Sequence, residues 1–244
     1  MRELYEKFKV LFGISPPEHE YYDSTREFER YDVEKLKGLY VTFNGGTKAE
    51  VINIGYGGML LKRDPVAKAK LFDADGITEC GLFVYGASYS FVVQLVRDTH
   101  RGIGVAFVHN DLEGFIWLRQ FLAYIQIGMG TKPHGVMPRR TPDGEVLAHF
   151  RGPSTTNLSI AYLGDEMRRV DMAFKDGESQ IKFEWTPESL ECLNFGGVTQ
   201  KIPLLCQCFF IFWGVSQGSV LEGSEFVVQD LEARLLSGEF SNTA

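Results

Sequence analysis

Apolar and polar residues alternate along much of the chain from residue 38 onward. Leu39, Val41 and Phe43 are separated by more polar positions, and such alternation is typical of a strand with one buried face. Asn44-Gly45-Gly46 follows, and Asn and Gly readily adopt the positive φ that a tight hairpin requires. Because closely spaced antiparallel strands usually close into a barrel or a sandwich, we expect such a unit from the strand-like runs at residues 39–43, 49–53, 59–61, 80–86, 89–97 and 102–108.

Two segments of the first half follow a helical period instead. Residues 1–12 carry apolar side chains at helical spacing, and Gly13 ends the pattern. Residues 15–25 contain two prolines and no regular pattern, which predicts a flexible arm. After the strands, Asn110 or Asp111 can cap a second helix, whose apolar residues recur at spacings of three and four: Phe115, Leu118, Leu122 and Ile125.

The second half of the chain also alternates, although the sequence shows no clear internal repeat. Val170, Met172 and Phe174 share one face of an expected strand, and Asp176-Gly177 is a hairpin signal. Further strands are expected at residues 181–185, 190–195 and 208–214, and a closing helix is expected at residues 225–236.

These patterns predict a mainly β protein. We expect an N-terminal helix and flexible arm at residues 1–25, followed by a six-stranded antiparallel barrel with its helix at residues 26–126. Residues 127–150 are rich in glycine, proline and basic side chains and are interpreted as a connecting segment. Residues 151–244 are expected to form a second antiparallel β-rich domain that ends in a helix.

Charge and hydropathy argue against two classes of protein, those that bind nucleic-acid polymers and those that span a membrane. The net charge of -7 argues against broad binding to a nucleic-acid polymer, although a local arginine cluster can still bind a small anion. The charged N-terminal residues lack the apolar core of a signal peptide. The most apolar stretch, residues 206–215, is too short to span a bilayer. We therefore expect a cytoplasmic protein without a membrane span.

The sequence offers no clear metal or catalytic centre. The four cysteines Cys80, Cys192, Cys206 and Cys208 lack the spacing of a metal site, and reduced thiols are expected. The five histidines are scattered, and no Gly-x-Ser-x-Gly nucleophile motif is present. We expect no catalytic residue and no metal, and hence no enzyme. The alternative is catalysis within residues 150–215, which a pocket holding a carboxylate of strongly shifted pKa would favour.

Two short motifs gain meaning when they are read together. Arg26-Glu27-Phe28-Glu29-Arg30 lies between the arm and the first expected barrel strand. Asn53-Ile54-Gly55-Tyr56-Gly57-Gly58 ends the second one. Asn53 follows Arg30 by 23 residues, which is enough for a strand, a hairpin and another strand. A barrel could therefore bring both motifs to one rim, whereas the arginine pair alone would favour a solvated face and the Asn-Gly segment alone could be a strand-ending turn.

This arrangement resembles the PilZ domain family, which carries R-x-x-x-R before its first barrel strand and D/N-x-S-x-x-G after its second. The resemblance covers about residues 26–125 and includes the helix after the barrel. It implies that Arg26 and Arg30 bind the phosphates and guanines of cyclic di-GMP, that Asn53 hydrogen-bonds to this ligand, and that Gly58 is the final motif glycine. Arginine suits such a ligand because it pairs bidentately with phosphate and with guanine.

One position departs from the family pattern, because Gly55 stands where the family has serine. Loss of one hydroxyl contact would cost about 0.5–1.5 kcal/mol if water replaces it. The resemblance implies a cyclic di-GMP receptor that couples ligand binding to motility, pili or surface attachment and biofilm formation through a downstream protein partner. The alternative is a PilZ-like protein-interaction module that has lost nucleotide binding. Homo-oligomerisation is left open.

Overall fold

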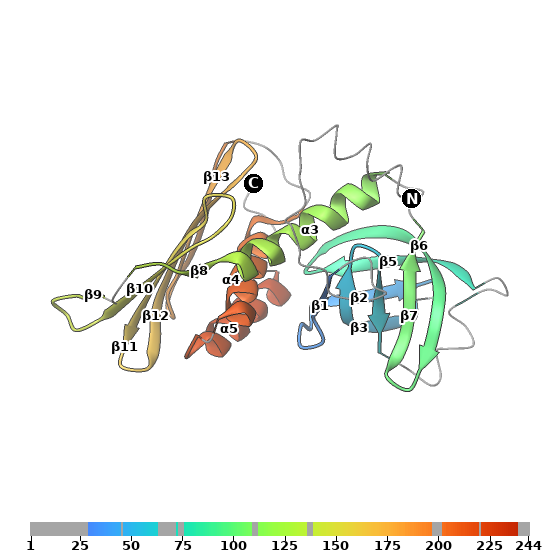
Figure 1. Ribbon diagram of the computed structural model, residues 1–244, viewed down its shortest axis with the longest axis horizontal. Coiled ribbons are helices and arrows are strands. Elements are labelled where there is room, and N and C mark those ends of the chain that lie inside the picture. The colour runs from blue at the N-terminus through green and yellow to red at the C-terminus, as the bar shows by residue number, and fades with distance from the viewer. Residues whose placement is uncertain are drawn as a thin grey trace.

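The computed structural model describes residues 29–44, 46–62, 72, 76–108, 112–135, 139–196, 202–219 and 221–238. The expected N-terminal helix, the arm and Arg26 lie outside these residues. Within them the chain forms two antiparallel sheets with helices between them (Figure 1). The mainly β class predicted from the alternating pattern is confirmed.

The first sheet closes into the six-stranded barrel that the sequence predicted. Its strands run in the order β3-β2-β5-β6-β7-β4, and β4 pairs again with β3. Every pairing is antiparallel. The strands are β2 (Leu39–Phe43), β3 (Lys48–Gly55), β4 (Gly58–Leu61), β5 (Ile77–Val84), β6 (Ala87–Thr99) and β7 (Gly102–Phe107).

A short additional strand, β1 (Arg30–Asp32), pairs with the end of β3. Since β4 occupies one edge of β3 over Val51–Gly55, β1 takes the other edge there. The hydrogen bond from the Val33 amide to the Ile52 carbonyl, 2.9 Å long, continues this pairing toward β2. The segment before the barrel is therefore part of the sheet.

The second sheet is an open antiparallel meander in the order β14-β13-β12-β11-β10-β8, with β9 also paired to β10. The positive φ of Gly177, 59°, turns the β12–β13 hairpin at the Asp176-Gly177 signal. The strands are β8 (Lys132–Pro133), β9 (Arg139–Arg140), β10 (Val146–Arg151), β11 (Asn157–Leu163), β12 (Glu166–Asp176), β13 (Ser179–Trp185) and β14 (Leu190–Phe195).

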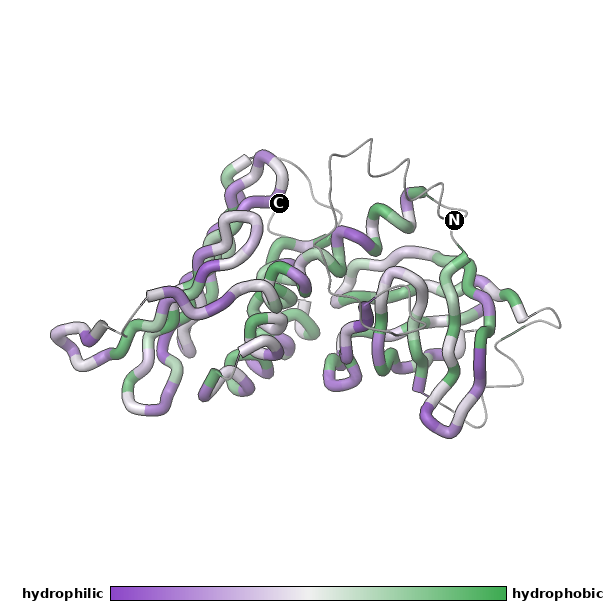
Figure 2. Tube along the Cα trace, viewed as in Figure 1, coloured by the Kyte–Doolittle hydropathy of each residue, from purple (hydrophilic) through white to green (hydrophobic). Residues whose placement is uncertain are grey.

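Three helices form a layer between the barrel and the second sheet: α3 (Leu112–Gly130), α4 (Leu204–Gly218) and α5 (Ser224–Ser237) (Figure 1). The first is the helix predicted after the barrel strands, and the last is the closing helix predicted at residues 225–236. Figure 2 shows hydrophobic residues along these helices and hydrophilic residues at many hairpin turns. Buried residues of the barrel, the helices and the second sheet form one continuous core.

Helix α4 overturns the prediction of a strand at residues 208–214. All residues from Leu205 to Val215 are buried, so the helix presents no polar face and its sequence lacks the helical alternation of apolar and polar residues. Aromatic and β-branched residues then imitate a buried strand. The cysteines are free thiols, and Cys192 Sγ of β14 lies 3.4 Å from Cys208 Sγ of α4.

A helix and a strand cross the boundaries at which the sequence predicted that the barrel domain ends and the second β-rich domain begins. Helix α3 runs to Gly130, past the expected domain boundary at residue 126, and β10 spans the expected boundary at residue 150. Glycines allow α3 and α4 to approach closely, because a Cβ on Gly128 would lie 2.1 Å from the Ile211 carbonyl oxygen. The division of the chain into domains stays a prediction. None of the described helices is long and apolar enough to cross a membrane.

Candidate functional site

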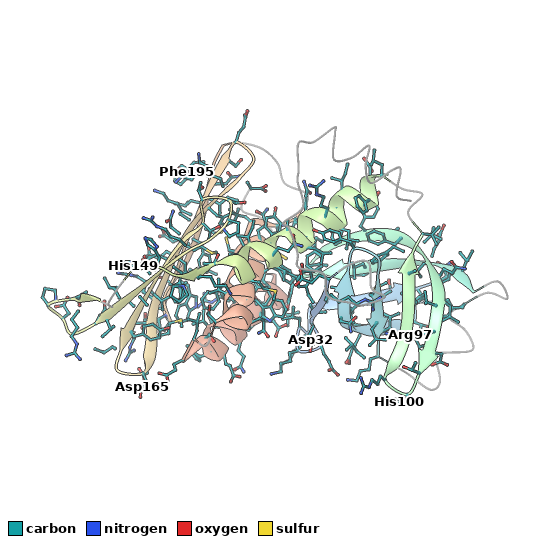
Figure 3. All side chains as sticks on the ribbon, viewed as in Figure 1. Asp32, Arg97, His100, His149, Asp165 and Phe195 are labelled. Carbon is teal, nitrogen blue, oxygen red and sulfur yellow. The ribbon has the colours of Figure 1, made fainter. Side chains whose placement is uncertain are left out.

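The pairing of β1 with β3 brings the two sequence motifs together at one rim of the barrel. Arg30 lies opposite Gly55, and Asp32 lies opposite Asn53. The Arg30 guanidinium donates a hydrogen bond from Nη1 to Asn53 Oδ1, 3.1 Å away. Figure 3 places Asp32 on the side of the barrel near the helices and His100 at the distal tip of the β6–β7 hairpin. We call the segments 29–32 and 53–58 the motif rim.

Gly55 has a steric role that the sequence did not reveal. A Cβ built on Gly55 would lie 2.3 Å from the Glu29 carbonyl oxygen and 3.2 Å from Arg30 Cγ. Real Cβ atoms essentially never approach a backbone atom this closely, so a serine at this position requires β1 to move. The glycine therefore permits the main chain before Arg30 to lie directly on β3.

Gly58 serves the closure of the barrel. Its φ is +152°, a conformation that residues with a side chain rarely adopt, and a Cβ there would lie 2.1 Å from the Val105 carbonyl oxygen. Gly58 pairs with Ala106 where β4 meets β7. The need for glycine at this position thus has a structural cause in the close approach of two strands.

A chain of hydrogen bonds joins the motif rim to α3. Tyr31 donates from its hydroxyl to Glu29 Oε2 over 3.1 Å. Gln126 of α3 donates from Nε2 to the same Tyr31 hydroxyl over 2.7 Å. The Tyr56 hydroxyl donates to Gln126 Oε1 over 3.3 Å. No sequence pattern assigned a role to Tyr31, Tyr56 or Gln126, although Tyr56 lies within the second motif.

Burial keeps both tyrosines of this network protonated. Desolvation raises the pKa of Tyr31; the hydrogen bond from Gln126 opposes this rise and the Glu29 carboxylate adds to it. Desolvation also raises the pKa of Tyr56, and the positive charge of Arg119 on α3 opposes that rise. Both hydroxyls are donors at neutral pH, as those of ordinary tyrosines are, and the raised pKa values extend this protonated range to higher pH.

Aromatic contact reinforces the attachment of Tyr56 to α3. The rings of Tyr56 and Phe115 lie 6.5 Å apart between centroids and are tilted by 46°. Phe115, Arg119 and Gln126 follow one another at helical spacings of four and seven, which places them on one face of α3. This face meets the turn between β3 and β4, so α3 contacts the second motif as well as the first.

The rim has the chemistry of a polar binding surface. Its side chains supply one guanidinium, one carboxamide, two carboxylates and two hydroxyls, from Arg30, Asn53, Glu29, Asp32, Tyr31 and Tyr56, and of these the Tyr31 side chain is buried. Such groups can bind an anion that also offers hydrogen-bond donors and acceptors. Among the residues that the structure describes, no group of three or more His, Cys, Asp or Glu side chains could hold a metal ion.

Comparison with protein-family models and with curated proteins gives no match. Among solved structures, the chain is similar to the crystal structure of an uncharacterized protein from Legionella. The two share 12% sequence identity with a TM-score of 0.32, and the similarity covers 40% of this chain and 98% of the other.

Proposed function

We propose that this chain is a receptor for cyclic di-GMP that resembles PilZ domains and binds its ligand at the motif rim. The hydrogen bond between Arg30 and Asn53 carries this proposal, because it joins one residue from each motif across the β1–β3 pair. The closed six-stranded antiparallel barrel that holds both residues is consistent with it. Arg26 would add a second guanidinium from the segment before Glu29.

The chemistry of Arg30 favours exchange of its contact with Asn53 for a contact with a phosphate. Asn53 offers one neutral carbonyl oxygen to the guanidinium, whereas a phosphate offers a charged, bidentate partner. Asn53 would then be released to bind a ligand edge with its own donor and acceptor. By the family resemblance, the output would be motility, pili, surface attachment or biofilm formation in the cytoplasm, through a downstream protein partner.

A second function is favoured by the contact between Gly55 and Glu29. The main chain of Glu29 occupies the space of the family's serine side chain, and β1 pairs with β3 along Arg30–Asp32. A barrel whose β1 is fixed in this way could act as a protein-interaction module that no longer binds a nucleotide. The two functions differ in a single measurable property, which is affinity for cyclic di-GMP.

Isothermal titration calorimetry with cyclic di-GMP distinguishes them. We expect the unaltered protein to bind, and Arg30→Ala to weaken binding about 10- to 100-fold, since a hydrogen bond to a charged group contributes about 1.5–3 kcal/mol. Arg101→Ala is the matched control, because Arg101 is an exposed arginine in the turn between β6 and β7.

Three results would count against the receptor. Absence of binding heat with the unaltered protein would favour the interaction module. An equal loss in Arg30→Ala and Arg101→Ala would show that net charge, and not the rim, governs binding. Unchanged affinity in both Arg30→Ala and Asn53→Ala would remove the motif rim as the binding site.

A further inference from the structure

We propose that Gln126 is the positioning residue through which the motif rim controls the helical layer. This proposal rests on the proposed receptor function, because it names the element that would respond to the ligand. Gln126 is the one side chain of α3 whose hydrogen bonds, among the described residues, reach both motif segments. Its amide donates to Tyr31, beside Arg30, and accepts from Tyr56, beside Gly55.

Both motif segments are hydrogen-bonded to this amide, so a movement of either segment alters its hydrogen bonds. Tyr31 is the residue after Arg30 and pairs with Ile54 in the strand ladder. Its hydroxyl holds the Glu29 carboxylate, and the Glu29 carbonyl lies against Gly55. A ligand that draws Arg30 away from Asn53 therefore shifts Glu29 and Tyr31, which changes the donor–acceptor geometry at Gln126.

Close helix packing carries a displacement of α3 into α4. Gly128 of α3 and Gly214 of α4 leave no room for a side chain, since a Cβ on either would lie 2.1 Å or 2.6 Å from a carbonyl oxygen of the other helix. The rings of Phe121 and Phe210 meet edge to face with centroids 4.8 Å apart. Gln126 lies between these contacts along α3, and well-packed helices transmit shifts because they have little free space.

A glutamine fits this position better than its charged counterpart. The same amide group donates a hydrogen bond to the Tyr31 hydroxyl and accepts one from the Tyr56 hydroxyl. A glutamate would lose the donor and would place a second carboxylate close to that of Glu29. Because the bond to Tyr56 is exposed, water can replace it, whereas the Tyr31 side chain is buried. The bridge can therefore open on its Tyr56 side at little cost, which lets it respond to a ligand.

Hydrogen–deuterium exchange of the full chain, with and without cyclic di-GMP, tests the proposal. In the ligand-free protein we expect Gln126→Leu, which removes two hydrogen bonds, to speed exchange at residues 31–33 and 54–57 by at least about three- to tenfold, the factor for the loss of one hydrogen bond. The matched control is Gln120→Leu, which alters an exposed glutamine of the same helix. Gln126→Glu should act in the same direction as Gln126→Leu.

When cyclic di-GMP is added, we expect hydrogen–deuterium exchange in α4 of the unaltered protein to change. The Gln126→Leu variant should bind cyclic di-GMP with an affinity within about tenfold of the unaltered protein, but its exchange in α4 should not change. Rim exchange equal to that of Gln120→Leu, or an intact response of α4 in Gln126→Leu, would overturn the proposal. If the unaltered protein does not bind cyclic di-GMP, the receptor function fails on its own. The ligand-free comparison then still decides whether Gln126 holds the rim.

Discussion

Two side chains of the helical layer, Glu232 and Gln126, each bridge two segments of the barrel, but one bridge is buried and the other is exposed. Glu232 of α5 accepts a hydrogen bond from the Lys37 amide over 2.7 Å and another from the Tyr85 hydroxyl, both at Oε1. Gln126 of α3 bonds to Tyr31 and Tyr56. Glu232 is 7% exposed, whereas Gln126 faces solvent.

The buried bridge is enclosed by aromatic side chains. The Tyr85 ring lies 5.1 Å from that of Phe209 and 5.9 Å from that of Phe210 between centroids. It also covers Gly38, where a Cβ would lie 2.1 Å from a ring carbon. Tyr85 adopts a positive φ of 44°, which is uncommon for a residue with a side chain. Several contacts therefore fix one conformation.

The difference assigns distinct roles to the two bridges. When the exposed bond between Tyr56 and Gln126 breaks, water can satisfy both partners at little cost, whereas a broken bond at Glu232 leaves a buried polar group without a partner. The buried bridge thus sets how α5 sits against the barrel. The exposed bridge at Gln126 opens more readily. Segments that open locally are suited to changing conformation when a ligand binds.

The largest effect is expected at the buried bridge. Glu232→Ala removes the acceptor of both the Tyr85 hydroxyl and the Lys37 amide, so we expect the free energy of unfolding in urea to fall by about 3 kcal/mol. Glu222→Ala, which alters an exposed glutamate in the turn before α5, should change it by less than about 0.5 kcal/mol. Similar losses in the two variants would contradict the contrast between the bridges.

The second-largest effect is expected at alkaline pH, which should lower the free energy of unfolding through Tyr85 of the buried bridge. Desolvation raises the pKa of Tyr85 above its ordinary value of 10.0, and the Glu232 carboxylate raises it further. Above pH 10 the unfolded chain loses this proton while the folded chain keeps it, so the free energy of unfolding falls as pH rises. Below about pH 10, the ionisation of Tyr85 does not affect the free energy of unfolding.

For each proton that the folded chain keeps and the unfolded chain has lost, the free energy of unfolding falls by about 1.4 kcal/mol per pH unit. Tyr85→Phe should reduce the slope by about this amount in urea unfolding between pH 10 and pH 11. Tyr40→Phe, at a half-buried tyrosine of β2, provides the comparison. A slope that Tyr85→Phe leaves unchanged would show that Tyr85 ionises alike in the folded and unfolded chains.

The sequence predicted the scaffold of these bridges better than the bridges themselves. Alternation along β2 and the spacing from Arg30 to Asn53 are local properties, and both are reflected in the fold. Helix α4 was mistaken for a strand because complete burial removed its polar face. The roles of Gln126 and Glu232 depend on which distant segments meet them, and one sequence carries no signal for that.

Gly55→Ala should have the smallest effect on global stability, although it acts at the motif rim. The new Cβ would lie 2.3 Å from the Glu29 carbonyl oxygen, but β1 is a three-residue edge strand that can move away. We therefore expect a loss of about 1 kcal/mol in urea unfolding, together with faster amide exchange at residues 31–33.

Gly58→Ala is the matched test, because it places the same kind of clash where the barrel closes between β4 and β7. Neither strand can leave without opening the barrel, so the loss in Gly58→Ala should be larger and should not be confined to β1. If Gly55→Ala instead lowers stability as much as Gly58→Ala, then β1 is held as firmly as a barrel strand. The rim would in that case be as rigid as the Glu232 bridge, and a ligand could not use its movement as a signal.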